Sequence, residues 1–184
     1  DRISGGRFLL GLGRSERFII RDRMGIPYSN PRSTMKEAVS IIRDLLAGRS
    51  VTSTDGRFRL GNVHLETKPV QTNPPIYLAA IGPKALRLAG AIADGVLLNA
   101  YTPTGYVRYA VAEIRKAALE AGRDPDSIDI ACMLVVRLTE DPESIWPGLK
   151  QRIVRLLEEP NVGEILLEKG GFDPSILGPL RAAA

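Results

Sequence analysis

Short apolar runs alternate with amphipathic stretches along the chain. The runs at 7–12, 76–80, 95–99 and 128–138 are largely apolar, and most of them are bounded by glycine, proline or an Asp-Gly pair. Runs of this length without polar alternation are typical of strands that are buried on both faces. We therefore expect four strands of a parallel sheet.

The stretches between these runs carry apolar residues at helical spacing. Asn30 is a candidate N-cap for a helix that begins at Pro31 and ends before Gly48. Further helices are predicted over 83–93 and over 107–121, the second ending at a glycine. Strand, helix, strand, helix, strand indicates an α/β protein, either an open doubly wound sheet or a closed (βα)₈ barrel.

Two segments lie outside this alternation. The stretch VTSTDGRFRL, residues 51–60, alternates about Asp55-Gly56 and predicts a hairpin on the surface. From residue 142 onward the sequence predicts two or three helices, broken at Pro147, Pro160, Gly170 and Pro174.

Composition restricts the class of protein. The chain has 184 residues, 44% hydrophobic and 25% charged, with a net charge of +4, as in ordinary globular proteins. Its longest apolar run, 130–136, is far shorter than the roughly 20 residues that span a bilayer. We expect a cytoplasmic protein with no membrane partner. The dispersed Lys and Arg residues, with few aromatics among them, indicate no nucleic-acid partner either.

The single cysteine and the first residue carry two smaller predictions. Cys132 lies inside the longest apolar run, so a reduced, buried and inert thiol is expected. The chain begins at Asp1 rather than at methionine, so we expect it to be part of a longer protein.

The strand predicted at 76–80 leads directly into Gly82-Pro83-Lys84. The small side chains of Ala79 and Ala80 leave room for a flat ligand, and Gly82 lets the chain turn with nothing projecting into that space. Pro83 fits the first turn of a helix. The pattern favours a ligand site where this strand ends.

The start of that helix is a candidate anion site. The free amides of Lys84 and Ala85 are expected to point outward from the positive end of the helix, where a phosphate fits. Lys84 and Arg87 add positive charge. Gly-Pro also begins many helices that bind nothing, so a purely structural role stays open.

The rest of this unit, LRLAGAIADGVLLN, predicts close packing. Ala89, Gly90 and Ala93 are expected to let the helix approach its sheet closely. Asp94 is expected to accept hydrogen bonds from backbone amides in the turn that follows. Asn99 either caps the next helix or contacts the ligand.

The chain resembles the bacterial luciferase-like superfamily in three stretches: DRISGGRFLLGLG (1–13), PRSTMKEAVSIIRDLLAG (31–48) and PIYLAAIGPKALRLAGAIADGVLLN (75–99). They most resemble its branch of oxidoreductases that use the deazaflavin coenzyme F-420, which includes methylenetetrahydromethanopterin reductases. The resemblance implies a (βα)₈ TIM barrel. With four strands, residues 1–184 would form a single incomplete barrel domain that lacks the first three strands and the last.

The resemblance also implies an enzyme and its site. It implies hydride transfer between coenzyme F-420 and a small organic substrate, with an acid or base from early strands that this sequence lacks, so the catalytic residue is unknown. The implied cofactor-binding residues are Gly11, Leu12 and Gly13 beside the ring, Ala79, Ala80, Ile81, Gly82 and Pro83 along the ring and the chain to the phosphate, and Lys84 near the helix end.

Other readings stay open. An FMN-dependent luciferase-like monooxygenase and a non-catalytic, shortened flavin-binding barrel are the alternatives. His64, the only histidine, lies in a predicted loop, where a surface or packing role is expected. The sequence shows no Ser-His-acid set and no metal-ligand spacing, which leaves hydrolases and metalloenzymes without support. Family members are commonly dimers, so a homodimer is expected.

Overall fold

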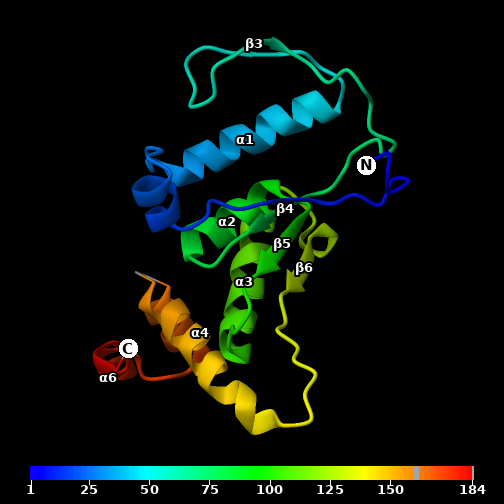
Figure 1. Cartoon of the computed structure of the whole chain (residues 1–184). Coiled ribbons are helices and arrows are strands. Elements are labelled where there is room, and N and C mark those ends of the chain that lie inside the picture. Colours follow the sequence, from blue (N-terminus) through cyan, green and yellow to red (C-terminus); the bar gives the residue numbers. More distant parts are fainter. Residues whose placement is uncertain (160–161, 184) are drawn as a thin grey trace.

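A computed structural model describes residues 1–159 and 162–183 of the chain (Figure 1). Its main sheet has four parallel strands in the order β1-β4-β5-β6. The strands are β1 (Leu10–Leu12), β4 (Ile76–Ala79), β5 (Gly95–Leu98) and β6 (Asp129–Cys132). Each lies within one of the four predicted apolar runs, so the predicted parallel α/β sheet is confirmed.

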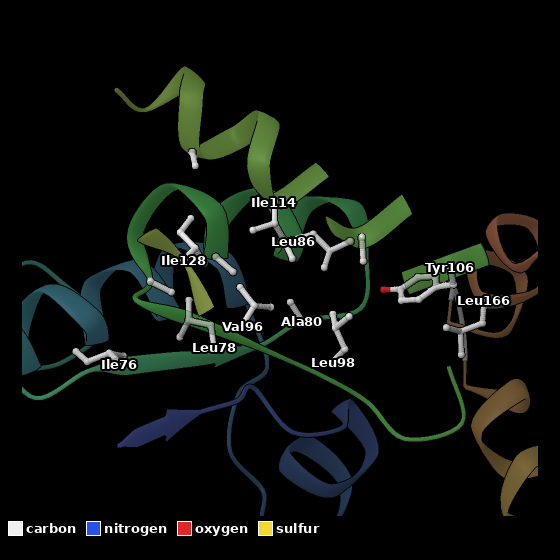
Figure 2. Packing of buried hydrophobic residues seen from close by; sticks show 14 of the residues in the cluster. Ile76, Leu78, Ala80, Leu86, Val96, Leu98, Tyr106, Ile114, Ile128 and Leu166 are labelled. Atoms are coloured by element: carbon white, nitrogen blue, oxygen red, sulfur yellow. The ribbon is translucent and has the colours of Figure 1, made fainter. Parts of the chain in front are cut away.

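Helices cover one face of this sheet. They are α1 (Pro31–Leu46), α2 (Pro83–Ile92) and α3 (Thr104–Glu120). Alternate strand residues point toward them, and Ile76, Val96 and Leu98 are fully buried. Figure 2 shows Leu86 of α2 and Ile114 of α3 on the helix side of these strand residues. This layer is the hydrophobic core, because each helix presents an apolar stripe to the same sheet face.

The opposite face of the sheet is lined by the remaining strand positions. Tyr77 of β4 lies across Gly95 of β5 and donates a 2.6 Å hydrogen bond to Asp129 of β6. A Cβ at Gly95 would lie 2.3 Å from the Tyr77 ring, so only glycine permits this crossing. The bond to Asp129 raises the pKa of Tyr77 to about 12, because ionisation would place two negative charges side by side.

Asp94 joins three elements at the amino-terminal end of the sheet. Its Oδ2 accepts a 2.8 Å bond from the Ile76 amide at the start of β4 and a 3.0 Å bond from Arg43 of α1. Arg43 also donates to the Ile92 carbonyl at the end of α2. Asp94 accepts a hydrogen bond from a backbone amide, as predicted, but the amide is that of Ile76 in β4 and not one in the turn that follows Asp94.

The small residues of α2 do permit close packing, but the prediction for Gly90 is wrong about its partner. A Cβ at Gly90 would lie 2.3 Å from the Ile114 carbonyl oxygen and 3.1 Å from the Ala117 Cβ, both in α3. Gly90 therefore lets α2 approach α3 rather than the sheet. Ala89 and Ala93 are fully buried. The spacing of small residues in the sequence predicted a closely packed face on α2 but not the element that this face contacts.

The predicted hairpin is present as β2 (Val51–Ser53) paired with β3 (Leu60–Val63). The Glu37 carboxylate of α1 accepts hydrogen bonds from the amides of Arg57 and Phe58 in its loop. In Figure 1 the hairpin lies on the far side of α1 from the main sheet. It is a surface excursion, as predicted.

The carboxyl-terminal part contains α4 (Trp146–Glu158), α5 (Gly163–Gly170) and α6 (Leu177–Ala183). Pro147 lies in the first turn of α4, so the expectation that it breaks a helix is wrong; a proline there lacks only an amide that has no helical partner. Gly170 ends α5, and Pro174 begins a short 3₁₀ turn, η4 (Pro174–Ile176). Pro160 lies outside the described residues.

The structure contains three further short helical turns: a π-helical turn, η1 (Phe18–Arg23), and the 3₁₀ turns η2 (Pro125–Ser127) and η3 (Pro142–Ile145). The prediction that Asn30 caps α1 is wrong. Asn30 precedes α1 with a left-handed φ of 44° and makes no side-chain capping bond.

The strand predicted at 128–138 is much shorter than expected. β6 ends at Cys132, opposite Leu98, which is the last residue of its neighbour β5. Among the described residues no strand continues the pairing beyond that point, and Met133, Leu134 and Val136 are exposed. Cys132 is exposed as well, so its predicted burial is wrong.

Candidate functional site

Two adjoining cavities lie where β1, β4 and β5 end. The larger, about 670 Å³, is bounded by the segments that follow these strands, and we call it the strand-end cavity. The smaller, about 490 Å³, lies between the first turns of α1 and α2, and we call it the helix-terminus cavity. Arg14, Ala79 and Ala85 line both. Parallel βα units bring strand ends and helix starts to the same side, which explains the adjacency.

Most of the predicted site residues converge here. Gly13, Ala79, Ala80, Ile81 and Gly82 line the strand-end cavity, which is the larger of the two. Ala79 also lines the helix-terminus cavity, and Lys84 lines that cavity alone.

The other predicted residues lie beside the cavities rather than in their walls. Leu12 packs against the hydrophobic core, and Gly11 is exposed within β1. Pro83 is the first residue of α2. The alternation of a strand directs Leu12 to the opposite face from Gly11, which explains why Leu12 packs against the core.

The helix-terminus cavity is lined by three cationic side chains. Arg14 follows β1, Arg32 lies in the first turn of α1, and Lys84 lies in the first turn of α2. In the described part of the chain, none of the three forms an ion pair with a carboxylate within 4.0 Å. The guanidinium of Arg14 lies 6.0 Å from the centre of the Tyr28 ring. Three cations beside two helix amino termini attract anions.

The predicted anion-binding groups need two corrections. The amide of Ala85 is not free, because it donates to the Gly82 carbonyl at 2.9 Å, and the Leu86 amide donates to the same oxygen at 3.0 Å. Arg87 points to the other side of α2 and pairs with Glu113 and Glu120 of α3. Arg87 therefore stabilises the α2–α3 contact and lines neither cavity.

Arg14 and Arg32 take the place that Arg87 was expected to have, although neither was among the predicted anion-binding residues. A signal was present: Pro31-Arg32 repeats the Pro83-Lys84 pattern, a proline followed by a cation at the start of a helix. Consecutive βα units place such starts at the same end of a parallel sheet. The repeated pair therefore indicates one shared cationic site.

Asn99 lines the strand-end cavity and does not cap α3. Pro103 is the residue before α3, and no side chain caps this helix. The Asn99 Oδ1 accepts a 2.9 Å bond from the Ala100 amide, and the Asn99 carbonyl accepts from the Thr102 hydroxyl at 2.9 Å. Of the two roles left open for Asn99, capping is excluded.

Two carboxylates, Glu16 and Glu159, also line the strand-end cavity. Burial raises the pKa of Glu159, and the negative charge and hydrogen bond of Glu16 raise it further, while Arg14 lowers it. His64 is exposed just after β3 and lines neither cavity. Across residues 1–159 and 162–183, no three His, Cys, Asp or Glu side chains are grouped to hold a metal ion.

Comparison with known proteins gives a consistent result. Residues 1–169 match the luciferase-like monooxygenase family. A 5,10-methylenetetrahydromethanopterin reductase from Methanolobus tindarius is 37% identical over 175 residues, which are 95% of this chain and 52% of that protein. The chain spans about half the length of the curated relatives it matches.

Two solved structures share the fold. The coenzyme F-420-dependent tetrahydromethanopterin reductase of Methanopyrus kandleri superimposes with a TM-score of 0.76 and 28% identity, over 94% of this chain and 53% of that chain. A monooxygenase from Streptomyces bottropensis gives a TM-score of 0.66 and 28% identity, over 84% of this chain and 48% of that one. The four-stranded sheet is part of a luciferase-like barrel, as predicted. None of the helices in the described ranges is long and apolar enough to cross a membrane.

Proposed function

Since the chain belongs to the luciferase-like monooxygenase family, we propose that it supplies the coenzyme-binding half of an F-420-dependent oxidoreductase. The observation that carries the proposal is the pairing of two cavities at the strand ends, one floored by small residues and one lined by cations. A coenzyme with a flat ring and an anionic tail needs both kinds of surface, side by side.

The residues of the two cavities bind different parts of the coenzyme. Ala79, Ala80 and Gly82 leave the strand-end cavity wide enough for a planar ring. Arg14, Arg32 and Lys84 bind the phosphate-bearing tail in the helix-terminus cavity, and among the described residues none of the three forms an ion pair with a carboxylate within 4.0 Å. The bound coenzyme supplies hydride transfer to or from a small organic substrate.

The role of this half of the protein is placement. The described residues would hold the ring against the strand ends and leave one side of it for the substrate. No residue here is assigned as the catalytic acid or base. The names of the relatives support F-420 chemistry, since the reductase from Methanopyrus kandleri is described as dependent on coenzyme F-420.

FMN is the second candidate cofactor. It shares a flat ring and a phosphate with coenzyme F-420, and the monooxygenase from Streptomyces bottropensis has the same fold. A shortened barrel that binds a flavin without turnover is the remaining alternative. The three readings differ in which coenzyme binds and in whether a substrate is reduced.

Fluorescence titration of the purified protein tests the proposal. We expect saturable binding of coenzyme F-420 that is tighter than binding of FMN. Arg32→Ala and Lys84→Ala should each weaken binding roughly 3- to 5-fold at low salt, because each removes one attraction to the tail. Lys116→Ala, on the exposed side of α3 and outside both cavities, should leave the affinity unchanged. Absence of binding to both coenzymes would refute the proposal.

The same proposal covers the assembly and location of the protein. We propose that residues 1–184 form one barrel-derived domain, that the protein is a homodimer in the cytoplasm, and that its partner in turnover is a small molecule. The edge strands β1 and β6 each have one neighbour in the described sheet, which favours association. Light scattering that gives the mass of a monomer would contradict the homodimer.

A further inference from the structure

A buried tyrosine hydroxyl contacts a backbone carbonyl at the wall of the strand-end cavity, from the side of the hydrophobic core. Tyr106 of α3 is fully buried, and its hydroxyl donates a hydrogen bond to the Ile81 carbonyl, in the segment that joins β4 to α2. Figure 2 shows the Tyr106 ring beside Leu166 of α5, with its oxygen directed toward the strands. Burial raises the pKa of Tyr106, so the hydroxyl keeps its proton and remains a donor.

This bond fixes the orientation of one peptide group. The described peptide bonds are all trans, so the carbonyl of Ile81 and the amide of Gly82 point in opposite directions. The carbonyl faces Tyr106 and the core. The Gly82 amide is therefore directed away from the core, on the side where Ile81 and Gly82 line the strand-end cavity.

The Gly82 amide has no acceptor among the described residues. The neighbouring carbonyl of Gly82 accepts two bonds from α2, from the amides of Ala85 and Leu86, whereas its own amide donates none. A Cβ at Gly82 would meet no atom within 4 Å, so the space beside it is open. An unpaired backbone donor beside open space is satisfied only by water or by a ligand.

We propose that Tyr106 is a positioning residue: it holds the Ile81–Gly82 peptide so that the Gly82 amide donates a hydrogen bond to an oxygen atom of the bound coenzyme. The inference rests on the proposed function, because it names a contact of the same site. A donor that is already oriented before binding strengthens the bond, since no ordering cost is added on association.

The first test removes the hydroxyl and keeps the ring. Tyr106→Phe should weaken binding of coenzyme F-420 about 5- to 10-fold in the folded protein at 20 °C, by fluorescence titration. Tyr109→Phe is the matched control, because Tyr109 lies in the same helix with its ring 6.1 Å away and makes no bond to this segment. A purely structural role would lower the unfolding temperature and leave the affinity unchanged, and that result would overturn the inference.

The second test removes the amide itself. Gly82 has a φ of −72°, which proline adopts without strain, and the amide that proline lacks has no protein acceptor to lose. Gly82→Pro should weaken binding by about the same factor as Tyr106→Phe, and by more than Gly82→Ala, which adds a carbon to the cavity wall but keeps the amide. The Gly82→Pro/Tyr106→Phe double variant should bind like Gly82→Pro alone, because both changes remove one interaction.

The outcomes separate the inference from the function on which it rests. Wild-type binding of coenzyme F-420 with equal affinities in all variants would overturn the role of Tyr106 and leave the proposed function standing. Equal losses of affinity in Gly82→Pro and Gly82→Ala would show that the added carbon, and not the missing amide, weakens binding. That result would also overturn the role of Tyr106. A wild-type protein that binds neither F-420 nor FMN would overturn the proposed function first.

Discussion

Removing the Asp94 carboxylate should destabilise the protein by about 2–3 kcal/mol. In Asp94→Ala the buried amide of Ile76 loses its 2.8 Å acceptor, and an unsatisfied buried donor costs about 1–3 kcal/mol. The ion pair with Arg43 is also lost; its side chains are each 36% exposed, so we assign it about 0.2–1 kcal/mol.

Urea unfolding followed by circular dichroism at 222 nm measures this loss, and the unfolding temperature should fall by roughly 5–10 °C for a chain of this length. Asp94→Asn keeps an acceptor oxygen for the Ile76 amide and should cost about 1 kcal/mol or less. The control is Asp126→Ala, whose carboxylate is 78% exposed and pairs only with Arg115 in the described residues. Its effect should stay within about 0.5 kcal/mol.

Two results would refute this reasoning. If Asp94→Ala unfolded within about 0.5 kcal/mol of the wild type, the backbone bond would not carry the stability assigned to it. If Asp94→Asn were as damaging as Asp94→Ala, the charge rather than the acceptor would be responsible.

Three further predictions follow from particular contacts. Gly90→Ala should destabilise the protein by about 2–4 kcal/mol in the same unfolding assay, since its Cβ would lie 2.3 Å from a carbonyl oxygen of α3. Gly148→Ala, in α4 with open space around it, should instead stabilise by about 0.5–1 kcal/mol, and equal effects of the two changes would contradict the packing argument. Tyr77 should titrate near pH 12 in phenolate absorbance, and Asp129→Asn should move that pKa back toward 10. Because the pKa of Tyr77 is raised in the folded state, its hydrogen bond to Asp129 contributes fully to the free energy of unfolding below about pH 10. That contribution is lost as the pH rises through 12. Cys132 should react with one equivalent of a thiol reagent in the native state, and protection until denaturant is added would restore the buried-thiol prediction.

The positions of the elements were predictable because local patterns encode burial. The four apolar runs each contain a strand of the main sheet, and the Pro31 and Pro83 signals mark the first residues of α1 and α2. The error at β6 is instructive. A largely apolar stretch of eleven residues predicts strand over its whole length, but a strand persists only as far as its neighbour, which ends at Leu98.

The site was predictable in part. Ala79 to Gly82 were predicted to form a ligand site from the small residues and the Gly-Pro helix start, and they do line the strand-end cavity. Their role in binding a coenzyme stays a prediction. The convergence of Arg14, Arg32 and Lys84 was not identified, since those residues are separated by up to 70 positions and meet only when β1 pairs with β4 across the hairpin excursion.

The sequence by itself determined where the strands of the main sheet lie, where α1 and α2 begin, and which family the chain resembles, because hydrophobic spacing and proline and glycine geometry act over a few residues. Only the tertiary structure decided directions: Arg87 turns to Glu120 rather than to the anion cavity, Gly90 meets α3, and Tyr106 reaches the Ile81 carbonyl. Those outcomes depend on how whole helices pack against one sheet, and side-chain direction across such a contact is set by the neighbour's shape rather than by local sequence.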